Sequence, residues 1–167
     1  KPIRQSLLRE CLHMILVKPE QDKDQGAHIL SEEFSKKYPL RILVAEDNNI
    51  NQRIAIKVLA KLGYEAVVAN NGSEALEMVS QDHYDIILMD VQMPVMNGLE
   101  ATRMMRTCLE VQPVIIALTA NAMHGDRDDC IQAGMDDYMS KPIELKELVM
   151  QLEKWALAIR EKRKMSA

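Results

Sequence analysis

The stretch Ile86-Ile-Leu-Met-Asp-Val-Gln-Met-Pro-Val-Met-Asn-Gly98 places a carboxylate directly after a short apolar run. Residues 86–89 are rich in isoleucine, which is typical of a strand buried on both faces of a sheet. The later residues Pro94 and Asn97-Gly98 indicate a turn before the next helical pattern. Asp90 therefore stands at the carboxyl end of a predicted strand, where open α/β sheets bind their ligands. Taken alone, the stretch fits equally well an aspartate that only caps a turn.

Composition restricts the classes of function. The chain has 167 residues and a net charge of −4, which argues against direct binding to nucleic acid or to an anionic membrane surface. Its apolar content of 47% is enough for a sizeable core, and no apolar stretch approaches the roughly 18 residues of a membrane span. Three cysteines lack metal-binding or redox spacing and are expected to be free thiols in a reducing cytoplasm: Cys11, Cys108 and Cys130.

Hydrophobic periodicity predicts five strands that alternate with five helices. The strands are expected at residues 41–46, 64–69, 85–89, 113–118 and 138–140, and the helices at 49–62, 73–80, 99–108, 123–133 and 144–159. This alternation is typical of βαβ units and predicts an α/β fold with a five-stranded, doubly wound parallel sheet. One order for such a sheet is the flavodoxin-like 2-1-3-4-5, which places the first and third strands side by side.

The pattern also divides the chain into segments. Residues 7–17 carry apolar side chains at helical spacing, and residues 1–17 are treated as a separate N-terminal segment. Residues 18–39 are mostly polar and are interpreted as a linker, with a helical turn expected at 29–34. One domain is therefore assigned to residues 40–160, and residues 161–167 to a charged tail. Because the chain begins with a lysine, we expect it to be a fragment of a longer protein.

Polar groups stand at the ends of four predicted strands. Glu46 and Asp47 end the first strand, Asp90 the third, Thr119 the fourth, and Lys141 follows the fifth. Because the strands of a parallel sheet end at the same edge, these side chains are expected to gather at one rim. Each has an ordinary explanation by itself: carboxylates cap helices, a threonine can end a strand, and a lysine can be solvated. Their coincidence at one rim favours a functional site.

Such a rim suits phosphoryl transfer. Clustered carboxylates repel one another unless a cation intervenes, and oxygen ligands in a partly hydrated site suit Mg²⁺. Asp90 is the candidate nucleophile, which would form an aspartyl phosphate. The charge on the transferred phosphoryl oxygens needs partners of opposite charge and hydrogen-bond donors. We assign metal binding to Glu46, Asp47, Asp90 and the Gln92 carbonyl, and phosphate binding to Lys141, Thr119 and the Ala120 N–H.

Residues 40–160 resemble the receiver domain of two-component response regulators. The matching motifs are Ile42-Leu-Val-Ala-Glu-Asp-Asn48, Leu88-Met-Asp-Val-Gln-Met-Pro-Val-Met-Asn-Gly98, Ala117-Leu-Thr-Ala-Asn121 and Tyr138-Met-Ser-Lys-Pro-Ile143. No key position departs from the family's pattern, and Glu46 in place of a second aspartate is a common variant. The amino-acid sequence of the acidic motifs looks like that found in hybrid histidine kinases. We therefore expect these residues to form the C-terminal receiver of such a kinase.

This resemblance implies a role in a phosphorelay. Asp90 would take a phosphoryl group from a phosphohistidine with Mg²⁺ bound, and Tyr138 would be the aromatic switch residue coupled to Thr119. The bond between Lys141 and Pro142 would be cis. The phosphoryl group would switch the conformation or pass to a histidine phosphotransfer protein. The expected partners are that protein and a histidine kinase core, and the expected location is the cytoplasm, whether or not the parent chain is anchored in a membrane.

An internal repeat supports the expectation that these residues come from a longer hybrid histidine kinase. Lys1-Pro-Ile-Arg-Gln-Ser-Leu-Leu8 resembles Lys141-Pro-Ile-Glu-Leu-Lys-Glu-Leu148. Residues 1–17 are therefore interpreted as the last strand end and the final helix of a preceding receiver-like module. A chance Lys-Pro-Ile sequence before a helix is the alternative.

Other functions fit the sequence less well. A phosphatase of the haloacid dehalogenase type would require a second aspartate two residues after Asp90, where Gln92 stands. A Rossmann or P-loop site would require a glycine-rich loop after the first strand. We expect no kinase core in these residues, so whether the chain counts as an enzyme stays open, because a receiver catalyses only its own phosphorylation. The remaining alternative is a pseudo-receiver that acts as a regulatory interaction module without being phosphorylated.

The helix after the first strand offers a docking surface. Helical spacing places one set of residues on its core face: Asn51, Ile54, Ala55, Val58, Leu59 and Leu62. Ile50 falls at the edge of that face, beside the acidic rim. Ile50 with Asn49 and Arg53 is therefore a candidate docking patch for a phosphotransfer protein. A single exposed isoleucine is also ordinary in soluble proteins and need have no function.

Overall fold

The computed structural model describes residues 33–120 and 124–165. Five strands form one parallel sheet in the order β2-β1-β3-β4-β5: β1 (Ile42–Ala45), β2 (Val67–Ala69), β3 (Ile86–Asp90), β4 (Val114–Thr119) and β5 (Asp137–Ser140). The helices of these residues are α3 (Glu33–Lys37), α4 (Asn49–Lys61), α5 (Gly72–Gln81), α6 (Gly98–Cys108), α7 (His124–Ala133) and α8 (Leu145–Met165). The predicted fold class and strand order are confirmed.

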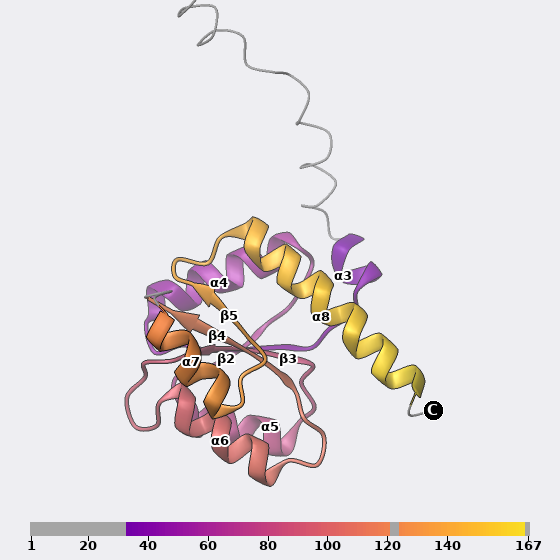
Figure 1. Cartoon of the computed structure of the whole chain (residues 1–167). Helices are drawn as coiled ribbons and strands as arrows, with labels where there is room; N and C mark the ends of the chain where they lie inside the picture. Colours follow the sequence, from indigo (N-terminus) through magenta and orange to yellow (C-terminus); the bar gives the residue numbers. More distant parts are fainter. Residues whose placement is uncertain (1–32, 121–123, 166–167) are drawn as a thin grey trace, which may run out of the picture. The chain divides into compact units, whose positions relative to one another are not determined.

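Helices cover both faces of the sheet (Figure 1). Helices α4 and α8 lie on one face, and α5, α6 and α7 lie on the other. Successive strand residues alternate between two apolar clusters: Val44 and Leu88 pack with Leu59 of α4, whereas Ala45 and Met89 pack on the opposite side. Because both faces are buried, the strands have no polar side, which is why they appear in the sequence as continuous apolar runs.

Asparagine side chains cap the three helices that follow β1, β2 and β3. The side chains of Asn48, Asn71 and Asn97 accept hydrogen bonds from the first turns of α4, α5 and α6. Such caps satisfy backbone N–H groups that have no partner within the helix. Asn97 also forms a capping box with Glu100. The chain therefore passes from β1 into α4 and from β2 into α5 through short loops whose caps are fixed by local hydrogen bonds.

The edge strand β2 is shorter than expected. It spans three residues rather than 64–69 and pairs with Leu43, Val44 and Ala45 of β1. Tyr64 lies before the strand but is still buried, and its hydroxyl donates to the Tyr38 carbonyl oxygen at 2.6 Å.

The outer boundaries of the domain also differ from the expectation. Helix α8 runs to Met165, so residues 161–165 continue the helix instead of starting a charged tail. The side chain of Arg163 forms an ion pair with the buried Asp85, which attaches this last part of α8 to the start of β3. Helix α3 lies within the expected linker at 18–39, and its Phe34 packs against the core.

The core face of α4 was predicted correctly except at two positions. Ala55 and Leu59 are buried as expected, but Ile54 is 38% exposed. Gln52 is buried instead, because its amide binds the Glu46 carbonyl oxygen and the Asn70 side chain. Polar contacts at the end of β1 therefore outweigh the apolar pattern in the first turns of this helix.

Some expectations lie outside the described residues. They include the helix at 7–17, the internal repeat at residues 1–8, Cys11 and most of the linker. Within the described part, Cys108 is exposed and Cys130 is buried, and they form no disulfide. None of the helices at 33–120 and 124–165 is both long and apolar enough to cross a membrane.

Candidate functional site

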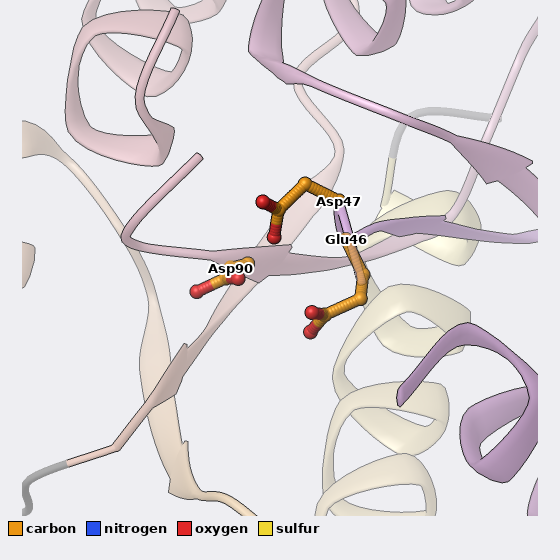
Figure 2. A group of neighbouring side chains, drawn as sticks. All are labelled: Glu46, Asp47 and Asp90. Atoms are coloured by element: carbon orange, nitrogen blue, oxygen red, sulfur yellow. The ribbon is translucent and has the colours of Figure 1, made fainter. Parts of the chain in front are cut away.

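A polar cleft of about 700 Å³ lies at the carboxyl edge of the sheet. Figure 2 shows three carboxylates there, from Glu46, Asp47 and Asp90. Each of the three side chains offers an oxygen that lies within 4.8 Å of the others. Glu46 and Asp90 are buried, at 2% and 4% exposure, whereas Asp47 is exposed. The structure therefore brings together the acidic groups that the sequence placed at the ends of β1 and β3.

Lys141 enters the cleft from the far side of β4. Its ammonium lies 2.7 Å from Oε2 of Glu46 and 2.6 Å from Oδ2 of Asp90. The Lys141 backbone N–H donates to the Thr119 carbonyl oxygen at 2.8 Å, which ties the loop after β5 to the end of β4. The bond between Lys141 and Pro142 is cis, as the resemblance implied.

The ionisation of Asp90 and Lys141 reflects this burial. Burial raises the pKa of Asp90 above its usual value, although hydrogen bonds from Lys141 and the Gln92 N–H act in the opposite direction. Burial alone would lower the pKa of Lys141, but its hydrogen bonds to Asp90 and Glu46 outweigh that effect and raise it. The lysine is therefore held as a cation between two carboxylates.

Hydrogen bonds in the loop after β3 hold the Asp90 side chain and close the loop against α6. The Gln92 N–H donates to Oδ1 of Asp90 at 3.0 Å, and the Gly98 N–H donates to the Val91 carbonyl oxygen at 3.1 Å. A Cβ atom added to Gly98 would lie 2.1 Å from the Asp90 carbonyl oxygen. Residue 98 must therefore be glycine, because α6 begins in direct contact with the backbone of Asp90.

The residues of the cleft fit a divalent cation. The donors are carboxylate oxygens, which are the hard ligands that Mg²⁺ prefers. Among the described residues that line the cleft, three carboxylates are accompanied by one cationic side chain, Lys141, which pairs with Glu46 and Asp90 and leaves net negative charge. The exposure of Asp47 leaves room on the solvent side for the water ligands that Mg²⁺ usually retains.

The other predicted site residues divide into two groups. Thr119, Ala120 and Gln92 line the cleft with the carboxylates. Tyr138 does not line it: its ring is half-buried in the apolar cluster on the face of α5, α6 and α7. The Arg127 guanidinium lies 5.2 Å from the centre of that ring.

The candidate docking patch lies beside the cleft but does not line it. Asn49, Ile50 and Arg53 are all exposed on the first turns of α4, and Ile50 is 69% exposed. Two neighbouring residues that line the cleft were missed as site residues by the sequence reasoning: Asn48 and Asn51. For Asn51, the sequence did hold a signal: it is an asparagine on the predicted core face. A buried amide needs a polar partner, and this indicates a polar site nearby.

Comparisons with known proteins agree on one family. A sequence profile described as the response regulator receiver domain matches residues 42–153. Histidine protein kinase 1 of Candida albicans is 46% identical over 121 residues, which are 66% of this chain and 5% of that protein. Hybrid signal transduction histidine kinase K of Dictyostelium discoideum is 41% identical over 124 residues, which are 68% of this chain and 10% of that protein. The chain thus spans only a small part of these relatives.

Solved structures extend the comparison to the fold. The receiver domain of the sensor histidine kinase PA1611 from Pseudomonas aeruginosa is 42% identical, with a TM-score of 0.64, over 70% of this chain and 97% of that one. Its structure has a magnesium ion coordinated in the active-site cleft. The receiver domain of Ssk1 from Saccharomyces cerevisiae was solved with the histidine phosphotransfer protein Ypd1. That structure is 31% identical, with a TM-score of 0.65, over 71% of this chain and 89% of that one.

Proposed function

This chain belongs to the response regulator receiver domain family, and on that basis we propose that Asp90 accepts a phosphoryl group from a phosphohistidine. The observation that carries the proposal is the position of Asp90. It ends the buried strand β3, lies 2.6 Å from the Lys141 ammonium, and shares the cleft with two further carboxylates. An aspartate that only capped the turn would not need this lysine or these acidic neighbours.

The transfer is a substitution at phosphorus. A carboxylate oxygen of Asp90 forms a bond to the phosphorus atom while the bond from phosphorus to the histidine nitrogen breaks. The imidazole leaves with the electron pair of that bond, and Asp90 becomes an acyl phosphate. Asp90 must be ionised to act as the nucleophile, and the adjacent Lys141 cation favours the ionised form.

Glu46, Asp47, Asp90 and the Gln92 carbonyl would hold Mg²⁺. The bound ion would neutralise charge on the phosphoryl oxygens during transfer. Lys141 would move its ammonium from the carboxylates to one phosphoryl oxygen, and the Thr119 hydroxyl with the Ala120 N–H would bind another. Thr119 is buried at the end of β4 and both residues line the cleft, which supports these roles.

Phosphorylation would then change the conformation of the domain. We expect Thr119 to move toward the phosphoryl group and the ring of Tyr138 to follow. Tyr138 lies on β5, opposite Ala117 of β4, so the two proposed switch residues stand on adjacent strands. The phosphoryl group would act by making contacts in one conformation that are absent from the other.

The proposed partner is a histidine phosphotransfer protein, with a histidine kinase core as the other source of phosphate. The Ssk1 receiver was solved in complex with such a protein, which supports this class of partner. On this chain, Asn49, Ile50 and Arg53 form the proposed docking patch beside the cleft. A partner helix laid there would bring its histidine toward Asp90, which is the positioning that transfer requires.

Intact mass measurement tests the proposal. The chain is incubated with acetyl phosphate and Mg²⁺, and the expected product carries one phosphoryl group. Asp90→Asn should give no such product, and excess chelator should prevent it in the wild type. An equal mass gain in Asp90→Asn would show a different acceptor. A folded wild-type chain that gains no phosphoryl group from either acetyl phosphate or a phosphorylated histidine phosphotransfer protein would favour the pseudo-receiver alternative.

A further inference from the structure

After the ion pair with Lys141, the hydrogen bond from Asn51 is the shortest contact of the Glu46 carboxylate among the described residues. Its amide Nδ2 donates to Oε1 of Glu46 at 2.9 Å. The Asn48 backbone N–H reaches the same oxygen at a longer 3.3 Å. Lys141 takes the other oxygen, Oε2, at 2.7 Å. The Glu46 carboxylate is therefore held from two sides, by a neutral amide and by a cation.

The first turn of α4 fixes Asn51 itself. The Asn48 side chain accepts from the N–H groups of Ile50 and Asn51, at 2.8 Å and 3.3 Å. This cap determines where the helix begins, and so it directs the half-buried Asn51 toward the end of β1.

Gln52 fixes the backbone of the same acid. Its buried amide donates to the Glu46 carbonyl oxygen at 2.6 Å and to Oδ1 of Asn70 at 3.0 Å. The Asn70 amide in turn donates to Glu74 of α5 at 2.9 Å. With its backbone held in this way, the place of the Glu46 carboxylate depends on its own side chain and on the groups that bind it.

We propose that Asn51 is a positioning residue for the metal site, and that its side chain is matched to a glutamate at position 46. This inference rests on the proposed function, because it concerns the Mg²⁺ that phosphoryl transfer would use. Asn51 holds the Glu46 carboxylate toward Asp47 and Asp90, in the place where the three can share one cation. Groups that orient a metal ligand from outside the coordination shell contribute strongly to metal affinity.

The match to glutamate follows from side-chain length. An aspartate at position 46 would have a carboxylate shorter by one carbon–carbon bond, or about 1.5 Å. The present Nδ2–Oε1 distance of 2.9 Å would then exceed the range of a hydrogen bond. Asn51 should therefore matter when residue 46 is glutamate and matter little when it is aspartate.

A double-mutant cycle on magnesium affinity tests this dependence. Magnesium chloride is titrated by calorimetry into the full chain as wild type, Asn51→Ala, Glu46→Asp and the double variant. We expect Asn51→Ala to weaken binding about tenfold when Glu46 is present. It should change binding less than about twofold when residue 46 is aspartate. Lys57→Ala, an exposed substitution on the same helix, is the matched control and should leave the affinity unchanged.

The outcomes separate this inference from the proposed function. Equal affinities in wild type and Asn51→Ala would overturn the positioning role alone, as would an equal loss whether glutamate or aspartate stands at position 46. A wild type that binds no magnesium would overturn both the metal site and this inference. Asn51→Ser, which keeps a polar but shorter side chain, repeats the cycle if Asn51→Ala does not fold. Circular dichroism should show unchanged helicity, because the cap comes from Asn48.

Discussion

The ammonium of Lys141 lies 2.6 Å from Oδ2 of Asp90, although the strand β4 separates the two strands that present them. Asp90 ends β3, and Lys141 follows β5. The lysine side chain must therefore extend across the end of β4 to reach the carboxylate. This ion pair therefore joins the ends of β3 and β5 across β4. It depends on the sheet order and on the length of the lysine side chain.

Lys141→Met should lower the free energy of unfolding by about 1–3 kcal/mol in the absence of metal. The reason is that Glu46 and Asp90 would stay buried without their shared cation. Magnesium should stabilise this variant more than it stabilises the wild type, because the added cation replaces the lost charge. Urea denaturation with and without magnesium chloride measures both effects. Lys146→Met, an exposed substitution on α8, is the control, and equal stability of the two variants would contradict the prediction.

Gly98→Ala should disturb Asp90 without touching its side chain. The new methyl group would lie 2.1 Å from the Asp90 carbonyl oxygen and 2.9 Å from Cγ of Met89. Because one of these neighbours is backbone, relief requires the loop or the start of α6 to move. We expect a loss of about 1–3 kcal/mol in stability, as overpacking usually causes, and slower labelling by acetyl phosphate. Wild-type stability together with wild-type labelling would show that the loop has more freedom than this contact implies.

Ile50→Glu should slow transfer from a histidine phosphotransfer protein about tenfold, a cost of about 1.4 kcal/mol. Ile50 is 69% exposed beside the cleft, so a charge there would oppose an apolar contact with a partner. Labelling by acetyl phosphate should not change, because a small donor needs no docking surface. Ile56→Glu, at a 39% exposed position farther along α4, is the matched control. Equal rates of transfer to both variants would show that Ile50 is not part of the docking patch.

Lys154→Ala should raise the pKa of Asp137. Burial acts to raise this pKa, but hydrogen bonds from Lys154 at 2.6 Å and from the Tyr138 N–H at 2.9 Å outweigh it, so the pKa lies below its ordinary value of 3.8. A carboxyl group with a lowered folded-state pKa stabilises the protein above its unfolded-state pKa and loses that effect as the pH falls through the folded-state pKa. The two proteins should therefore differ in stability at neutral pH, begin to converge as the pH falls toward 3.8, and converge fully only below the lowered folded-state pKa of Asp137.

Titration of the side-chain carbon resonances by nuclear magnetic resonance measures this pKa directly. Denaturation at pH 7 and at acid pH measures the linked stability. An unchanged pKa of Asp137 in Lys154→Ala would show that the ion pair between β5 and α8 contributes little in solution. The physical reason would then be solvent screening, because the Lys154 side chain is 60% exposed.

The sequence by itself determined the sheet and the chemistry at its edge. Buried parallel strands have no polar side, so each strand appears as a short apolar run, and the first polar group after it marks the carboxyl edge. This rule located Asp90 after β3, Glu46 and Asp47 after β1, and Thr119 at the end of β4. The alternation of strands and helices then predicted a parallel sheet, because consecutive strands joined through a helix run in the same direction.

Tertiary structure alone decided the contacts within that edge. Helical spacing predicted Ile54 to be buried and gave no role to Gln52, because periodicity counts apolar residues and ignores polar partners that lie far away in sequence. The last part of α8 is held by Asp85, which is far away in sequence, and β2 pairs with β1 over only three residues, which the apolar pattern did not show. The hydrogen bond from Asn51 to Glu46 and the reach of Lys141 across β4 likewise arise only when separate strand ends are packed side by side.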